Sequence, residues 1–114
     1  MSIQTEAIED IVARFQSRDI DGMRLHIHPD FNWFDAHGAV VLQGAEAFLS
    51  AIVGTWKDFP ELVNTSSLCI QVGNLVSHTE TFRGYSDGHI EEWIWVYEFQ
   101  GNQVLKMYGF LNGA

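Results

Sequence analysis

The chain has 114 residues, a hydrophobic content of 46% and a formal net charge of −9. This length fits a single domain over residues 1–114, and the hydrophobic content excludes a disordered chain. With only six Lys and Arg, the surface cannot neutralise phosphates, so we expect no nucleic acid and no membrane as partner. The single cysteine, Cys69, excludes an intrachain disulfide, and its apolar surroundings predict an inert core thiol.

The N-terminal segment MSIQTEAIEDIV lacks the basic and apolar blocks of a signal peptide. No apolar run reaches the roughly 18 residues of a membrane span. We therefore expect a cytoplasmic protein.

Apolar residues at helical spacing predict a first helix over residues 4–17. They are Ile8, Ile11, Val12 and Phe15. A short second helix is expected at about 20–27, with Asp19 as its N-cap and Pro29 ending it.

Residues 31–34 are expected to form a strand, which turns at residues 36–38 and returns over 39–42. A third helix follows Gly44, because apolar residues again recur at helical spacing. They are Phe48, Leu49, Ile52, Val53 and Trp56. Pro60 closes the connection to the strands.

Four long strands are predicted in the rest of the chain, over residues 62–72, 75–85, 89–99 and 104–111. Glycine-containing turns separate them, which indicates an antiparallel meander. Helices followed by strands are typical of an α+β fold. We expect three N-terminal helices packed on a strongly curved, mostly antiparallel sheet that encloses a cone-shaped pocket.

In the segment EEWIWVYEF, alternate residues belong to opposite faces of a strand. The face with Trp93, Trp95, Tyr97 and Phe99 is expected to look toward the helices. The other face, with Ile94 and Val96, could meet solvent or a second copy, and an exposed Ile and Val on a long sheet favour a second copy. The sequence therefore predicts a homodimer formed through the outer face of the sheet.

Two segments resemble a known family. The segment SRDIDGMRLHIHPDFNWFDAHG is similar, without gaps, to the ketosteroid isomerase segment between helix 1 and the catalytic aspartate. The segment YEFQGNQVLKMYGF resembles the closing hairpin of the same family. With the order of elements, they make nearly the whole chain similar to the NTF2-like superfamily, which includes ketosteroid isomerases and SnoaL-type polyketide cyclases.

This resemblance implies roles for three positions. The isomerases shuttle a proton with an Asp on the strand after the second helix, and that position matches Asp35. Their oxyanion hole consists of a Tyr on helix 1 and a protonated Asp in the sheet, which match Ile11 and Trp95 here. Ile11 cannot donate a hydrogen bond, whereas the indole N–H of Trp95 can.

Two interpretations of Asp35 remain open. As a general base it needs an apolar environment that raises its pKa, and Trp33 and Phe34 could supply it. Alternatively, its carboxylate caps the bend at Ala36-His37.

His78 and Glu80 share one face of a predicted strand with Phe82. The pair could act as a relay in which the carboxylate fixes the tautomer of the imidazole. The alternation allows this face to look into the pocket or into solvent, and an antiparallel sheet with one wet face favours solvent.

Seven aromatic side chains are expected to line the pocket: Phe15, Trp33, Trp56, Phe82, Trp93, Tyr97 and Tyr108. Histidines at 26, 28 and 37 suggest a metal, but their spacing lacks a third firm ligand. We expect neither a metal nor a cofactor.

Two hypotheses follow. The first is an enzyme with isomerase-, cyclase- or lyase-type acid–base chemistry on a small apolar, carbonyl-bearing molecule. In it Asp35 moves the proton, and Trp95 with Tyr97 or Tyr108 stabilises charge on oxygen. The second is a non-catalytic ligand-binding or association domain, in which aromatic rings fill the cone.

Overall fold

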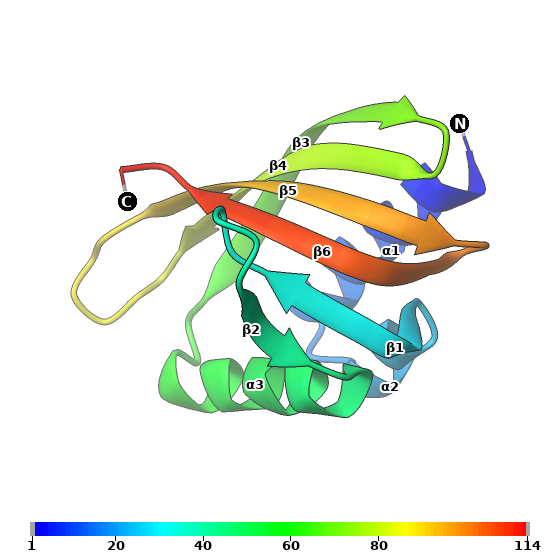
Figure 1. Cartoon of the computed structure of the whole chain (residues 1–114). Helices are drawn as coiled ribbons and strands as arrows, with labels where there is room; N and C mark the ends of the chain where they lie inside the picture. Colours follow the sequence, from blue (N-terminus) through cyan, green and yellow to red (C-terminus); the bar gives the residue numbers. More distant parts are fainter. Residues whose placement is uncertain (1, 114) are drawn as a thin grey trace.

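The computed structural model describes residues 2–113, apart from the side chains of residues 68 and 69, so the prediction for the Cys69 thiol lies outside the described residues. Three helices precede or interrupt six strands (Figure 1). In chain order the elements are α1 (Ile3–Gln16), α2 (Ile20–Arg24), β1 (Ile27–Phe34), β2 (Val40–Gln43), α3 (Ala45–Asp58), β3 (Val63–Val72), β4 (Leu75–Arg83), β5 (Glu91–Gln100) and β6 (Gln103–Leu111).

The first helix begins at a capping box, in which the side chains of Ser2 and Thr5 bond to each other's backbone N–H groups. In its apolar stripe, Ile8, Ile11 and Phe15 are buried, as the spacing predicts, and Val12 is half-buried. Asp19 caps α2 by accepting a hydrogen bond from the backbone N–H of Gly22 at 2.9 Å. The cap of α2 is therefore confirmed.

The expected end of α2 is wrong, because the helix stops at Arg24 and β1 begins at Ile27, before Pro29. Proline lacks a backbone N–H and is tolerated in a strand only where ladder pairing is interrupted. The pairing of β1 with β6 does break between Ile27 and Asn32, which accommodates the ring of Pro29.

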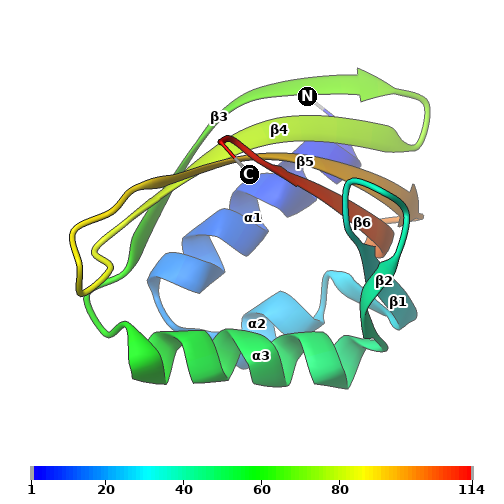
Figure 2. The same cartoon turned by 60° about the vertical axis from the view of Figure 1, so that its left-hand side comes forward.

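A single six-stranded sheet has the order β2-β1-β6-β5-β4-β3. Only β1 and β6 pair in parallel, and the other neighbours are antiparallel. The last four strands form the predicted meander. The sheet is curved and does not close, and the helices cover its concave side (Figure 2), so the predicted α+β cone architecture is confirmed.

The two faces of β5 differ as the sequence predicts. Trp95, Tyr97 and Phe99 are buried against the helices, whereas Ile94 is 51% exposed on the outer face. The same inward face of β4 carries buried Val76, His78, Glu80 and Phe82. Among the described helices, none is both long and apolar enough to cross a membrane.

Candidate functional site

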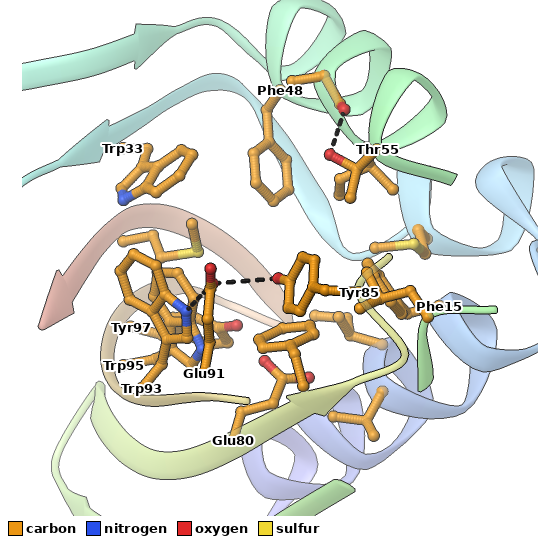
Figure 3. A pocket seen from close by; sticks show the side chains of 18 residues that line it. Phe15, Trp33, Phe48, Thr55, Glu80, Tyr85, Glu91, Trp93, Trp95 and Tyr97 are labelled. Atoms are coloured by element: carbon orange, nitrogen blue, oxygen red, sulfur yellow. Dashed lines mark hydrogen bonds between the residues drawn. The ribbon is translucent and has the colours of Figure 1, made fainter. Parts of the chain in front are cut away.

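A cavity of about 240 Å³ lies between the helices and the inner face of the sheet (Figure 3). All three helices and four strands contribute to its walls. The structure places along it five of the seven aromatic side chains expected there: Phe15, Trp33, Phe82, Trp93 and Tyr97. An apolar cavity of roughly 150 Å³ holds a benzene molecule, so this space is large enough for a small ring system.

Glu80 projects from β4 into this aromatic cavity. Glu80 is only 7% exposed, so its carboxyl group is largely removed from water. Burial raises the pKa of Glu80 to about 7, because a charged carboxylate is poorly solvated among aromatic rings. At neutral pH, Glu80 can therefore either accept or donate a proton.

Two neutral groups favour the charged form of Glu80 and oppose part of this rise. The side-chain amide of Asn64, on β3, donates a hydrogen bond to Glu80 Oε2 at 2.6 Å. The indole N–H of Trp95 also lowers the pKa of Glu80, although Trp95 Nε1 has no hydrogen-bond partner of standard geometry. Asn64 itself is 1% exposed, so its amide is fixed in the core.

A second carboxylate, that of Glu91, lines the cavity and is itself half-buried (Figure 3). Its oxygens accept hydrogen bonds from Tyr85 Oη and Trp93 Nε1, both at 3.1 Å, and contact His89 Nε2 at 2.9 Å. Burial alone would raise the pKa of Glu91, but these donors lower it. Glu91 is thus held as a charged group, whereas Glu80 is not.

His78 is buried rather than exposed to solvent, at 2% exposure. Burial lowers its pKa to about 4, so the imidazole is neutral at physiological pH. Its Nδ1 lies 2.9 Å from Ser66 Oγ, while the hydrogen bond of Glu80 goes to Asn64. The structure therefore does not join His78 and Glu80 into a relay, and His78 is not among the cavity-lining residues.

Asp35 lies in the hairpin between β1 and β2 and is not among the lining residues. Its Oδ1 accepts the backbone N–H groups of His37 at 2.8 Å and Ala39 at 3.0 Å. These bonds lower the pKa of Asp35, whereas the general-base interpretation needs a raised pKa. The geometry is that of the alternative interpretation, a carboxylate that caps the turn.

Two of the expected pocket residues lie elsewhere. Trp56 packs edge-on against Phe15 with ring centroids 5.5 Å apart, and Tyr108 stacks on Phe34 at 5.1 Å. Conversely, sequence patterning missed Tyr85 and Glu91, which lie near the β4–β5 connection. The alternation that puts Trp93 and Trp95 inward also puts Glu91 on the inner face, and this signal could have identified it.

The described residues contain no group of three or more His, Cys, Asp or Glu side chains placed to hold a metal ion. His26 instead bonds to Asp10 Oδ2 at 2.7 Å, which ties the start of β1 to α1. His28 Nδ1 accepts the backbone N–H of Asp30 at 3.0 Å. These two histidines therefore have local structural roles.

Several solved structures share this fold. An uncharacterised cystatin-fold protein from Novosphingobium aromaticivorans is 22% identical, with a TM-score of 0.84 over 96% of this chain and 98% of that one. TerC, co-crystallised with polyporic acid, is 20% identical, with a TM-score of 0.78 over 97% and 92% of the two chains. IdmH from Streptomyces antibioticus, for which a polyketide cyclase activity has been proposed, is 19% identical, with a TM-score of 0.78 over 96% of this chain and 91% of that one.

No curated protein matches the sequence. The model of the SnoaL-like domain family, however, matches residues 8–107, which run from within α1 to within β6. The chain belongs to the family of SnoaL-like domains.

Proposed function

We propose that this protein is a small-molecule enzyme in which Glu80 transfers a proton to and from an apolar, carbonyl-bearing ligand bound in the cavity. The observation that carries the proposal is the position of Glu80, which is 7% exposed, lines the cavity and has a pKa of about 7. A general base is most effective when its pKa lies near the working pH. Asp35, whose pKa is lowered, does not meet this requirement.

The proposed step begins with Glu80 ionised. Its carboxylate takes a proton from a carbon next to the ligand's carbonyl group. The electron pair of the broken C–H bond forms a C=C bond to the carbonyl carbon, and the π pair of the C=O bond moves onto oxygen. Protonated Glu80 then returns the proton to the same carbon or, in a β,γ-unsaturated ligand, to the γ carbon, and the C=O bond forms again. The indole N–H of Trp95, which favours the ionised form of Glu80, would stabilise the charge on the ligand oxygen once Glu80 has taken the proton.

The family supports this class of function in general terms. SnoaL-like membership fits a cavity that holds a small molecule. Among the similar folds, IdmH is described as a cyclase of polyketides and TerC was crystallised with polyporic acid. At about 20% identity, these proteins share the fold, and their ligands suggest only the kind of molecule to try.

Exchange of carbon-bound hydrogen with solvent deuterium tests the proposal without knowledge of the overall reaction. We would incubate the protein with 2-tetralone or 1-indanone in D₂O and follow the loss of the α-proton signals by NMR. The wild-type protein should accelerate the exchange over buffer. Glu80→Gln keeps an acceptor for Asn64 but cannot take a proton, and should lose about 100-fold of the acceleration.

Two variants complete this design. Asp35→Asn keeps the side-chain oxygen that caps the turn and should exchange at the wild-type rate. Glu9→Gln removes one charge from the exposed side of α1 and controls for net charge. An unchanged rate in Glu80→Gln, or a lost rate in Asp35→Asn, would contradict the proposal.

A non-catalytic binding role is the second candidate. It is favoured by Ile11, an apolar side chain that lines the cavity and offers no hydrogen bond to a developing oxyanion. Ligand binding without any acceleration of exchange by the wild-type protein would support this role over the enzymatic one.

A further inference from the structure

The cavity has acidic groups and aromatic rings but no basic group among its described lining residues. Glu80 and Glu91 supply the two carboxyl groups, and eight of the lining side chains are aromatic. A ligand carboxylate or phosphate would meet like charges in a poorly solvated space. The charge pattern therefore excludes anions and leaves neutral molecules and cations as candidate ligands.

We propose that the cavity selects an organic cation, with an apolar ring body and a protonated or quaternary amine that lies against Glu80. This inference rests on the ligand-binding part of the proposed function and names the class of ligand. It does not depend on whether proton transfer occurs.

Among the described lining residues, Glu80 has no cationic side chain to pair with. Its described hydrogen bond comes from a neutral amide, that of Asn64, and no Lys, Arg or His lines the cavity with it among the described residues. Buried carboxylates are ordinarily paired with a cation. An ammonium group of the ligand would supply that partner, and it would hold Glu80 in the ionised form that accepts a proton.

A cluster of tryptophan rings lines the same cavity as the carboxyl groups of Glu80 and Glu91. Trp93 and Trp95 stack in parallel with centroids 4.5 Å apart, and Trp33 meets them edge-on at 6.5 Å and 5.8 Å. The faces of indole rings carry negative potential and attract organic cations. Trp95 Nε1 is also buried, and its N–H favours the ionised form of Glu80 with which an ammonium group would pair.

The protein already shows this attraction beside the cavity. The guanidinium carbon of Arg18 lies 5.5 Å from the ring centroid of Trp56 and 5.8 Å from that of Phe15. Arg18 donates to the carbonyls of Pro60 and Leu62 and does not line the cavity. It therefore leaves the charge of Glu80 for a ligand to neutralise.

A matched pair of probes tests the inference. Phenyltrimethylammonium and tert-butylbenzene have nearly the same shape and differ in charge. Their binding can be followed at pH 8 by tryptophan fluorescence, because Trp33, Trp93 and Trp95 line the cavity. We expect the cation to bind about tenfold more tightly than the neutral isostere. Glu80→Gln should reduce this preference and keep its affinity for tert-butylbenzene, while Glu9→Gln should keep both.

Calorimetry on the wild-type protein gives a test that needs no variant. At pH 7 about half of Glu80 is protonated, so binding of the cation should release about half a proton per complex, and binding of tert-butylbenzene none. The released protons are measured from titrations in two buffers with different ionisation enthalpies. Three other titratable groups near Glu80 do not change protonation near pH 7: Tyr85, Glu91 and His78. His89 lies at the rim, and any protons that it releases would also be released in Glu80→Gln.

Equal or tighter binding of tert-butylbenzene would overturn the cation inference and leave the proposed function standing. A preference for the cation that is undiminished in Glu80→Gln would overturn it as well. If neither probe binds to the wild-type protein, both the inference and a ligand-binding cavity of this size are contradicted.

Discussion

Glu80 and His78 lie two residues apart on the same buried face of β4, and burial acts on them in opposite directions. It raises the pKa of the acid to about 7 and lowers the pKa of the base to about 4. Both shifts disfavour the charged form. Near neutral pH the inner face of β4 therefore carries a neutral imidazole and a carboxyl group that is poised between its two forms.

The raised pKa of Glu80 predicts how its replacement changes stability. The folded state keeps Glu80 protonated up to about pH 7, whereas the unfolded state releases this proton near pH 4.5. The contribution of Glu80 to the free energy of unfolding is therefore fully present below pH 4.5 and is lost as pH rises through 7. Relative to wild type, Glu80→Gln should therefore gain up to about 3 kcal/mol between pH 4 and pH 8. Urea denaturation at both pH values measures this gain, and an equal difference at the two pH values would contradict it.

Asn64 adjusts the pKa of Glu80 through its hydrogen bond and does not line the cavity itself. Its hydrogen bond favours the carboxylate and lowers the pKa of Glu80, so its removal should raise that pKa further. We predict that Asn64→Ala shifts the pH midpoint of α-proton exchange upward. A merely structural role would lower the exchange rate at all pH values and leave the midpoint in place.

At the scale of elements, β6 provides the floor on which the tryptophans of β5 lie. Gly109 in β6 is paired with Trp95 in β5. A Cβ at position 109 would come within 2.4 Å of Trp95 Cζ3 and 3.1 Å of Trp93 Cζ3. The close approach of these rings to the sheet thus requires a residue without a side chain.

Replacing Gly109 with Ala should therefore displace both rings. We expect a loss of roughly 1–3 kcal/mol in unfolding free energy, as for other overpacked cores, together with weaker probe binding. Gly54→Ala is the matched control, because a Cβ there meets nothing within 4 Å and alanine favours the helix α3. Urea denaturation of both variants checks the prediction, and equal stability of the two would refute it.

The elements that periodicity defines were predictable, and those set by tertiary context were not. The stripe of α1 and the alternation of β5 identified the buried faces, since each depends on local spacing. The start of β1 was missed because a proline in a strand depends on the pairing partner, here the interrupted ladder with β6.

The site shows the same division. The aromatic walls at Trp33 and Trp93 followed from alternation and from the family resemblance. The choice between Asp35 and Glu80 did not, because it depends on which carboxylate is desolvated. That is set by the turn amides around Asp35 and by the cavity around Glu80, which spacing does not reveal.

At the scale of the whole molecule, the outer face of the sheet exposes apolar side chains. Ile94 and Phe110 are opposite each other in the pairing of β5 with β6 and are 51% and 39% exposed. A groove between β4, β5 and the end of β6 runs beside them. We propose that a second copy of the chain covers this face, as the sequence predicts.

Sedimentation velocity at micromolar concentration tests the dimer. The wild-type protein should sediment as a dimer, and Ile94→Lys should sediment as a monomer, because burying an unpaired charge in the interface is unfavourable. Val53→Lys, on the exposed side of α3, is the control and should remain dimeric. A monomeric wild-type protein would refute the dimer and leave the cavity proposal untouched.

The fold of the whole molecule desolvates one carboxyl group, that of Glu80, inside an aromatic cavity. The most direct test is the pKa of Glu80, measured from the ¹³C chemical shift of its side-chain carboxyl carbon and assigned by comparison with Glu80→Gln. We predict a midpoint near pH 7, in line with the value that burial gives it. A midpoint at or below the ordinary glutamate value of about 4.3 would contradict the account.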